Sequence, residues 1–463
     1  MDDLVDVGAT PPHRGAPAGG RDGGPALGPD EGPVQRELLP MTAEVGTDGS
    51  LAVGGVGLLE LAERFGTPLF VYDEEHLRVR CREAVDAWGD GVAYATKAFL
   101  CLAMAKLAHE EGMWLDVSTG GELHVALSAG VPAARLVLHG NNKSEPELAR
   151  ALSVGVGRIV LDSFDEIDRL ARLAPAPAPA AEGRSADGRQ AVMLRVTPGV
   201  EAHTHDFVRT GQEDSKFGFG LASGAASQAV ARVRALPGLD LVGIHAHIGS
   251  QVFRVDSFAQ EVEALAGFFS PLGLTELCVG GGLGVPYVAR ETAPSLSQWA
   301  QTVHDACRSA GIPAETRVTA EPGRSIVAAA GVTLYRVGTI KELPGVRTYV
   351  AVDGGMSDNP RPVLYGSGYE TFLPRQPTAL RPLTARVVGK HCESGDIVVA
   401  DARLPADVVV GDVLATPVTG AYGYSMASNY NKVPRPGVVF VAEGEARVVV
   451  RRETDDDLIR LDG

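Results

Sequence analysis

Short apolar runs alternate with segments of helical periodicity through the middle of the chain. The runs begin at eight places, namely VAYATK (92), WLDVST (114), LVLHG (136), RIVLD (158), AVMLRV (191), LVGIHAHI (241), ELCVGGG (276) and RVTAEPG (317). Between them apolar residues recur at helical spacing, as in 98–112, 121–130 and 257–269. Strands alternating with helices over this length predict a (β/α)8 barrel, with an open doubly wound sheet as the alternative.

The pattern changes after residue 330. Apolar and β-branched runs continue with turns between them and almost no helical spacing, at 332–340, 347–355, 381–391, 396–404, 412–422 and 437–452. This texture predicts a second, all-β domain of sandwich or barrel type over 331–463, after a barrel over 74–330. Residues 41–73 are expected to join the β domain. Residues 1–40 form a Gly- and Pro-rich tail, and 174–190 a flexible insert.

Composition and charge narrow the function classes. The 463 residues carry a net charge of −16, which argues against nucleic acid or an anionic membrane as a partner, and no apolar run has transmembrane length. The five cysteines are scattered without CxxC spacing, so neither a disulfide framework nor a structural zinc site is predicted. The first residues have no basic or apolar region typical of a secretory signal. We therefore expect a cytoplasmic protein.

Polar residues follow the predicted barrel strands, where the chemistry of such barrels lies. Lys97 ends the first run, and burial of its stem would lower the pKa of its amine and make it nucleophilic. A lysine that extends to the rim of the barrel is the alternative. Polar residues and glycines also follow other runs, and they include Ser118, Gly120, Gly121, His139, Asn141, Asn142, Asp162, Ser163, His247, Gly249 and Ser250.

The seventh and eighth strand ends resemble a phosphate site. Gly280, Gly281 and Gly282 would free backbone N–H groups for an anion, and Gly323 and Arg324 would open the next helix. Glycines that only permit a turn are the alternative. A dinucleotide fingerprint fails on spacing, because valine stands at position 285.

A nucleophilic lysine beside a phosphate cradle predicts pyridoxal phosphate, bound as a Schiff base to Lys97. Glu321 would then keep the pyridine nitrogen protonated and make the ring an electron sink. His247 would stack on the ring face, unless it is a histidine held by hydrogen bonds in the core.

The motifs together resemble those of the barrel-fold pyridoxal-phosphate decarboxylases, and within them the diaminopimelate decarboxylases. The matching segments run in order from about residue 55 to 455. They include YATKAF, LDVSTGGEL, HGNNKS, EAHTHDFVRTGQEDSKFGF, HAHIGSQ, GGGLG, AEPGRS, DGGMSDNPRPVLY, GKHCESGD and GAYGYSMASNYN.

The resemblance implies a role for each matching position. Lys97 would bond the cofactor and Cys392 would donate a proton. The remaining cofactor-binding residues would be His247, Ser250, Gly280, Gly281, Gly282, Glu321, Gly323, Arg324 and Tyr422. The substrate-binding residues would be Arg324, Arg361, Tyr365, Glu393 and Tyr422.

The resemblance also implies a head-to-tail homodimer in which the loop with Cys392 reaches the barrel of the other subunit. A small buried residue is the alternative reading of Cys392. Glu393 follows Cys392 where the related ornithine decarboxylases have aspartate. Arg361 would bind a second carboxylate bidentately, unless it is an exposed loop arginine.

We therefore expect decarboxylation of meso-2,6-diaminopimelate to L-lysine and carbon dioxide. Decarboxylation of another basic amino acid (ornithine, arginine or carboxynorspermidine) is the main alternative. A homologue that binds the cofactor without turnover is a further alternative, which the joint presence of Lys97, Glu321 and Cys392 disfavours.

Overall fold

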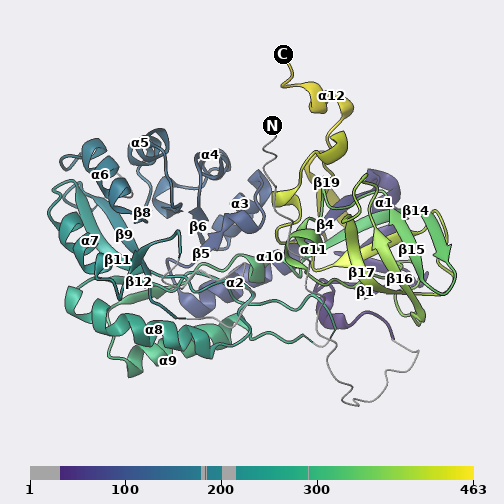
Figure 1. Ribbon diagram of the computed structural model, residues 1–463, viewed down its shortest axis with the longest axis horizontal. Coiled ribbons are helices and arrows are strands. Elements are labelled where there is room, and N and C mark those ends of the chain that lie inside the picture. The colour runs from purple at the N-terminus through teal and green to yellow at the C-terminus, as the bar shows by residue number, and fades with distance from the viewer. Residues whose placement is uncertain (1–31, 179–182, 184, 201–214, 290) are drawn as a thin grey trace, which may run out of the picture.

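The computed structural model describes residues 32–178, 183, 185–200, 215–289 and 291–463. Three expectations from the sequence fall wholly or partly outside these residues: the tail up to residue 31, part of the 174–190 insert, and the motif at 201–214. The described chain folds into a barrel and a β-rich part that lie side by side (Figure 1). No helix among the described residues is long and apolar enough to cross a bilayer.

Eight parallel strands form the barrel, at the positions predicted from the apolar runs. In spatial order, they are β13 (Arg317–Thr319), β12 (Glu276–Cys278), β11 (Leu239–His245), β9 (Gln190–Thr197), β8 (Arg158–Leu161), β7 (Leu136–Leu138), β6 (Trp114–Val117) and β5 (Ala93–Ala95). Hydrogen bonds from Ala93 N to Ala320 O (3.0 Å) and from Ala95 N to Pro322 O (3.1 Å) join β5 to the segment after β13. The predicted barrel is confirmed, and the open sheet is excluded.

Helices cover the outside of the barrel (Figure 1). They are α2 (Glu74–Trp88), α3 (Leu102–Glu110), α4 (Gly120–Ser128), α5 (Glu145–Val154), α6 (Phe164–Leu173), α7 (Ala225–Arg234), α8 (Asp256–Phe269), α9 (Leu296–Ser309) and the short α10 (Arg324–Val327). Side-chain caps begin several of them. Ser144 and Ser295 form capping boxes with Glu147 and Gln298, and Ser163 accepts a hydrogen bond from the Glu166 N–H.

Side chains inside the barrel lie in layers, because successive residues of a strand point to opposite sides. The lower layer is an apolar cluster of Ala93, Trp114, Val137, Val160, Met193 and Cys278. Two residues further along the same strands come Ala95, Asp116, His139, Asp162, Arg195 and Gly280. The apolar layer thus closes the barrel beneath a layer that is largely polar.

The second part of the structure is one mixed sheet. Its strands follow the order β17 (Ile397–Leu404), β16 (Leu383–Val388), β15 (Arg347–Val352), β14 (Gly331–Leu343), β4 (Leu69–Asp73), β19 (Gly437–Ala442) and β20 (Glu445–Val450), with β18 (Val413–Pro417) paired to β14. β4 precedes the barrel in sequence but lies between β14 and β19, so the chain leaves this sheet to build the barrel and then returns.

The remaining elements are short. They comprise β1 (Glu44–Val45), β2 (Leu51–Val53), β3 (Val56–Gly57), β10 (Phe219–Gly220), α1 (Leu58–Phe65), α11 (Arg361–Tyr365), α12 (Asp455–Ile459) and the 3-10 turns η1 (Arg36–Leu38), η2 (Thr96–Ala98), η3 (Ala133–Arg135), η5 (Ser270–Leu272), η6 (Tyr424–Met426) and η7 (Tyr430–Lys432).

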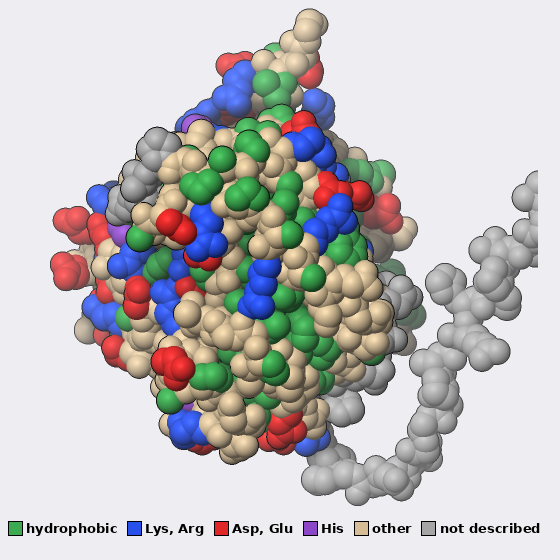
Figure 2. Space-filling model, turned by 90° about the vertical axis from the view of Figure 1, so that its left-hand side faces the viewer, with side chains coloured by type: hydrophobic (Ala, Val, Ile, Leu, Met, Phe, Trp, Pro, Cys, Tyr) green, Lys and Arg blue, Asp and Glu red, His purple; other side chains and the backbone are tan. Residues whose placement is uncertain are grey.

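Charged side chains of both signs are interspersed on the barrel face that Figure 2 shows, with apolar atoms between them. Within the described part of that face, the basic residues do not gather into one continuous surface.

Candidate active site

A cavity of about 320 Å³ opens at the C-terminal ends of the barrel strands. Nine of the residues predicted for the site line it: Lys97, His247, Ser250, Gly281, Gly282, Glu321, Gly323, Arg324 and Tyr422. Further lining residues include Asp116, Ser118, His139, Asn141, Arg195, Phe217 and His245. Among the described lining residues, Gly280, Arg361, Tyr365, Cys392 and Glu393 do not appear.

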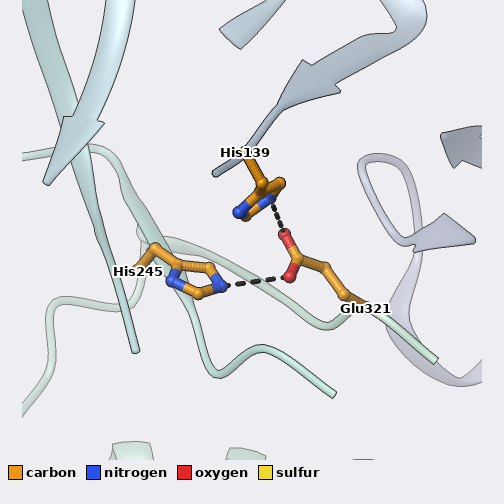
Figure 3. A group of neighbouring side chains, drawn as sticks. All are labelled: His139, His245 and Glu321. Carbon is orange, nitrogen blue, oxygen red and sulfur yellow. Dashed lines mark hydrogen bonds and ion pairs between the residues drawn. The ribbon is translucent and has the colours of Figure 1, made fainter. Parts of the chain in front are cut away.

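Glu321 is held in place by two histidines, His139 directly after β7 and His245 at the end of β11, two strands that β8 and β9 separate in the sheet. His139 Nε2 lies 2.8 Å from Glu321 Oε1, and His245 Nε2 lies 3.0 Å from Oε2 (Figure 3). Burial by itself would raise the pKa of Glu321, but its electrostatic interactions and hydrogen bonds with the two histidines lower it well below its usual value. The carboxylate is therefore ionised, and both of its oxygens are oriented.

The pKa values of the two histidines are shifted in opposite directions. Burial lowers the pKa of His245 to about 4, so this ring is neutral at pH 7. Burial also disfavours the cation at His139, but Asp116 and Glu321 outweigh it and raise the pKa of His139. Donor atoms of His139, His245 and Glu321 lie within 4.8 Å of one another, a spacing that a metal ion could use. The two hydrogen bonds account for the arrangement without an ion.

Asp116 is a buried carboxyl group at the floor of the cavity. Its Oδ1 has no hydrogen-bond partner among the described residues and lies 3.8 Å from His139 Nε2. Burial raises the pKa of Asp116 to about 6, in spite of His139 and Lys97. A buried polar atom without a partner is costly unless a ligand satisfies it.

Lys97 lies in η2, directly after β5, and its side chain is exposed to the cavity. Burial by the surrounding protein lowers the pKa of its amine, but Tyr422, Asp116 and Glu321 outweigh this and raise it. The expected lowering of the Lys97 pKa is therefore wrong. Glu321 and Tyr422 were predicted for the site, but their effect on this pKa was not foreseen, and Asp116 was given no role.

Tyr422 packs against the segment that carries Lys97. Its N–H donates to Ala98 O (2.8 Å), and this contact accompanies a backbone φ of +61°, which bulky residues rarely adopt. The ring lies beside Arg324, whose Cζ is 4.7 Å from the ring centroid. Tyr422 thus connects the β-rich part to the mouth of the barrel.

The glycine run serves close packing of the strand ends as well as the cavity. A Cβ on Gly281 would lie 2.3 Å from Glu321 O, and one on Gly282 would lie 2.1 Å from Gly249 O. The Gly281 N–H donates to His247 Nδ1 at 3.2 Å, so it is not free for an anion. The helix expected after Gly323 is α10, with only four residues, so a large dipole contribution is not supported.

Arg324 is a candidate anion-binding group that lines the cavity. It donates to Ser250 Oγ (2.9 Å) and to the Tyr287 hydroxyl (2.7 Å). Arg361 lies nearby and is 4 % exposed, so the reading of it as an exposed loop residue is wrong. Its Nη1 donates to the Tyr369 hydroxyl (2.6 Å), whereas Tyr365 is 40 % exposed.

Cys392 and Glu393 lie on an exposed turn of the β-rich part, so a buried thiol is excluded. Asp396 holds this turn: its Oδ2 accepts from His391 N (2.9 Å) and its Oδ1 from Met356 N (2.6 Å). The Cys392 N–H donates to Asn431 Oδ1 (3.1 Å). The turn is therefore held by hydrogen bonds, although neither the Cys392 nor the Glu393 side chain lines the cavity of its own chain.

Sequence reasoning assigned no role to Asp116, His139, Arg195 and His245. Three of them could have been predicted from the two-residue period of a strand. Asp116, His139 and Arg195 each lie two residues beyond an apolar residue of the lower layer. A polar residue at that position in a buried strand points into the cavity.

Comparison with known proteins decides the family. Residues 74–328 match the family model described as the pyridoxal-binding domain of pyridoxal-dependent decarboxylases. The chain belongs to this family. It is 47% identical over 434 residues to the diaminopimelate decarboxylase of Mycobacterium tuberculosis, covering 89% of this chain and 95% of that protein. It is 45% identical over 446 residues to that of Bacillus subtilis, covering 92% and 98%.

Solved structures of the family agree with the fold. The diaminopimelate decarboxylase of M. jannaschii in complex with L-lysine has a TM-score of 0.82 at 32% identity, covering 91% of this chain and 98% of that one. The Helicobacter pylori decarboxylase, also with L-lysine, has a TM-score of 0.77 at 30% identity, covering 87% and 98%. The resemblance stated from the motifs is confirmed.

Proposed function

We propose that this chain decarboxylates meso-2,6-diaminopimelate to L-lysine and carbon dioxide with pyridoxal phosphate, the last step of lysine biosynthesis. The observation that carries the proposal is one cavity lined by the Lys97 amine, the ionised Glu321 carboxylate and the Arg324 guanidinium, with the Arg361 guanidinium beside it. The relatives that match over most of the chain carry the name of this activity.

The cavity fits the cofactor in charge and chemistry. Lys97 supplies the amine that would hold the aldehyde, and Glu321 supplies an oriented anion for the ring nitrogen. Arg324 and Ser250 supply the cation and hydroxyl for the phosphate, and the described residues include no carboxylate paired with Arg324. The cofactor, when bound, accepts the electrons released as the Cα–carboxylate bond breaks.

The remaining cofactor contacts are assigned as the motifs implied. His247 would lie against the ring, and burial together with Lys97 keeps its pKa well below the usual value, so it presents a neutral face. Tyr422, Gly281, Gly282 and Gly323 would surround the phosphate. Gly280 would act by letting the strands approach, because it does not reach the cavity.

Substrate would be bound between Arg324 and Tyr422 on one side and Arg361, Tyr365 and Glu393 on the other. Arg361 is buried and has no carboxylate partner among the described residues, so a substrate carboxylate would complete its charge. Glu393 would bind the distal ammonium. A substrate that fits both residues carries an amine and a carboxylate at the end remote from the reacting carbon, and diaminopimelate is such a molecule.

Cys392 is assigned as the proton donor to Cα through its Sγ, in a head-to-tail homodimer. Because Cys392 and Glu393 do not line the cavity of their own chain, a loop from a second copy is the route by which they would reach one. The ordered turn held by Asp396 supports a loop built to present a side chain outward. We also place the enzyme in the cytoplasm, which five free cysteines favour.

The test is turnover by the purified protein with pyridoxal phosphate. We expect carbon dioxide and lysine from meso-diaminopimelate, and far less product from the LL isomer, ornithine or arginine. Equal turnover of ornithine would overturn the assignment of Arg361 to a carboxylate and favour a decarboxylase of other basic amino acids. Cofactor binding without turnover of any of these substrates would favour the inactive homologue.

A further inference from the structure

Tyr287 is a buried side chain between the two arginines of the site, and sequence reasoning gave it no role. It is 3% exposed and lies in the loop after β12, five residues beyond Gly282. Its hydroxyl accepts a hydrogen bond from Arg324 Nη1 (2.7 Å). Its ring faces Arg361, whose Cζ lies 4.1 Å from the ring centroid. One side chain therefore contacts both guanidinium groups.

The two contacts differ in kind. Arg324 donates to the hydroxyl of Tyr287, with its Cζ 5.8 Å from the ring centroid. It donates its other nitrogen to Ser250 Oγ (2.9 Å), which points it to the phosphate end of the cavity. Arg361 meets the π face, an arrangement that is favourable for a guanidinium and stronger when it is desolvated. The Arg361 nitrogens are further fixed by Tyr369, whose hydroxyl accepts from Nη1 (2.6 Å).

Tyr287 is itself fixed from several sides. Its ring packs edge-on against Tyr369, with centroids 5.2 Å apart and an interplanar angle of 79°. Its N–H donates to Glu291 (2.7 Å), and two residues later the Ala289 N–H donates to Glu370 Oε1 (3.3 Å). Arg381 in turn donates to Glu370 Oε2 (2.9 Å). The loop is thus bound to the segment that follows α11, and Tyr287 has little freedom to move.

Two cations close to one ring would normally repel each other or recruit acids. Among the described residues, no carboxylate lies within ion-pair distance of Arg324 or Arg361. The positive charges of Arg324 and Arg361 are therefore available to pair with anionic groups of the ligands. A rigid group that sets the direction of both guanidiniums therefore reduces the ordering cost of binding each anion.

We propose that Tyr287 is a positioning residue that aligns Arg324 for the cofactor phosphate through its hydroxyl and Arg361 for the distal substrate carboxylate through its ring. The inference rests on the proposed function, because that function assigns the two anions. It predicts that the hydroxyl and the ring of one residue control recognition of two different ligands.

Two ratios measure the two contacts without depending on overall stability. Affinity of the apoprotein for pyridoxal phosphate relative to pyridoxal reports the phosphate contact. Affinity of the holoenzyme for L-lysine relative to cadaverine reports the carboxylate contact, since cadaverine lacks only that group. Tyr287→Phe removes the hydroxyl and keeps the ring, and Tyr287→Leu removes both. Tyr369→Phe is the matched control, because its hydroxyl serves Arg361 alone.

We expect Tyr287→Phe to reduce the preference for pyridoxal phosphate over pyridoxal about tenfold, the usual size of a hydrogen bond to a charged group, and to spare the preference for lysine. Tyr287→Leu should reduce both preferences, and Tyr369→Phe only that for lysine. An unchanged phosphate preference in Tyr287→Phe, or loss of only one preference in Tyr287→Leu, would overturn the inference alone. A wild-type protein that binds neither pyridoxal phosphate nor lysine would instead overturn the proposed function and this inference with it.

Discussion

Mixing two inactive variants should restore activity if each active site is shared between subunits. Lys97→Ala removes the amine of the cavity, and Cys392→Ala removes a thiol that lies on an exposed turn outside the cavity of its own chain. Each homodimer carries one lesion in both of its sites. In a mixed dimer, one site collects both lesions and the other collects neither.

The recovered activity follows from counting sites. Random pairing of equal amounts makes about half of the dimers mixed, and each closed twofold dimer has two sites. One intact site in each mixed dimer is about a quarter of all sites, so activity should approach about a quarter of wild type per total subunit. Exchange of subunits must reach equilibrium for this value to apply.

The assay is carbon dioxide release after the variants are mixed, compared with the same variants held apart. The matched control is a mixture of Lys97→Ala with Glu321→Gln. Both of these residues line the same cavity of one chain, so every site in that mixture keeps at least one lesion. Activity of the control mixture should stay at the average of its two components.

Two outcomes would refute the shared site. If the Lys97→Ala and Cys392→Ala mixture stayed at the average of its components while exchange was demonstrated by mass spectrometry of tagged subunits, Cys392 would serve its own barrel or none. If Cys392→Ala alone were as active as wild type, the assignment of the proton donor would fail before any mixing.

Three further changes test separate parts of the structure. Arg361→Met should raise the KM for diaminopimelate by tenfold or more, since truncating one partner of a buried charged contact costs about 2–5 kcal/mol. A changed cofactor Kd with an unchanged KM would contradict the assignment of Arg361 to the substrate. Glu276→Gln should lower the free energy of unfolding by about 2 kcal/mol in urea titrations. The reason is that the partly buried Glu276 carboxylate contacts Arg158 and Arg317 at the barrel end opposite the cavity. A loss of cofactor affinity with an unchanged free energy of unfolding would contradict this prediction. Glu261→Gln should stabilise the protein by about 1–3 kcal/mol at pH 8, because this carboxyl is fully buried with both oxygens unpartnered among the described residues. Burial raises the Glu261 pKa, so the free energy of unfolding of the wild type falls as pH rises above the unfolded-state pKa of about 4.5. The stability advantage of the Gln variant should therefore shrink as pH falls towards 4.5. A constant advantage from pH 4 to 8 would refute this direction.

The sequence was sufficient for the barrel because its strands are short, apolar and bounded by helices with clear caps. Eight runs such as 136–138 and 158–161 alternate with helical spacing, which favours the barrel over the open doubly wound sheet. The β-rich part was equally visible, since its strands are separated by turn residues. The position of β4 in the middle of that sheet depends on pairing with β14 and β19, which lie more than 250 residues away. A non-local pairing of this kind leaves no local pattern.

Position at the end of a strand was a useful but incomplete guide to the candidate site, because His139 and His245 also lie at strand ends and were given no role. Lys97 and Glu321 follow their runs directly, whereas Asp116 sits inside the run WLDV and reads locally as an interruption. The direction of the Lys97 pKa shift could not be foreseen, because it depends on Asp116 and Tyr422, which come from a neighbouring strand and from the β-rich part. No local pattern predicted a role for Tyr287, because the two arginines that it contacts are distant in sequence.

The charge of the site explains how an acidic protein can bind an anionic cofactor. The chain carries −16 overall, yet Arg324 and Arg361 keep their charge free of acids within the described structure, while Glu321 and Asp116 lie deeper, against the histidines and Lys97. Arg324 near the mouth and the Glu321 carboxylate deeper in the cavity match a ligand with a phosphate at one end and a protonated ring nitrogen at the other. Local placement therefore decides recognition, because the many surface acids are screened by salt within about 10 Å whereas the enclosed groups are screened much less.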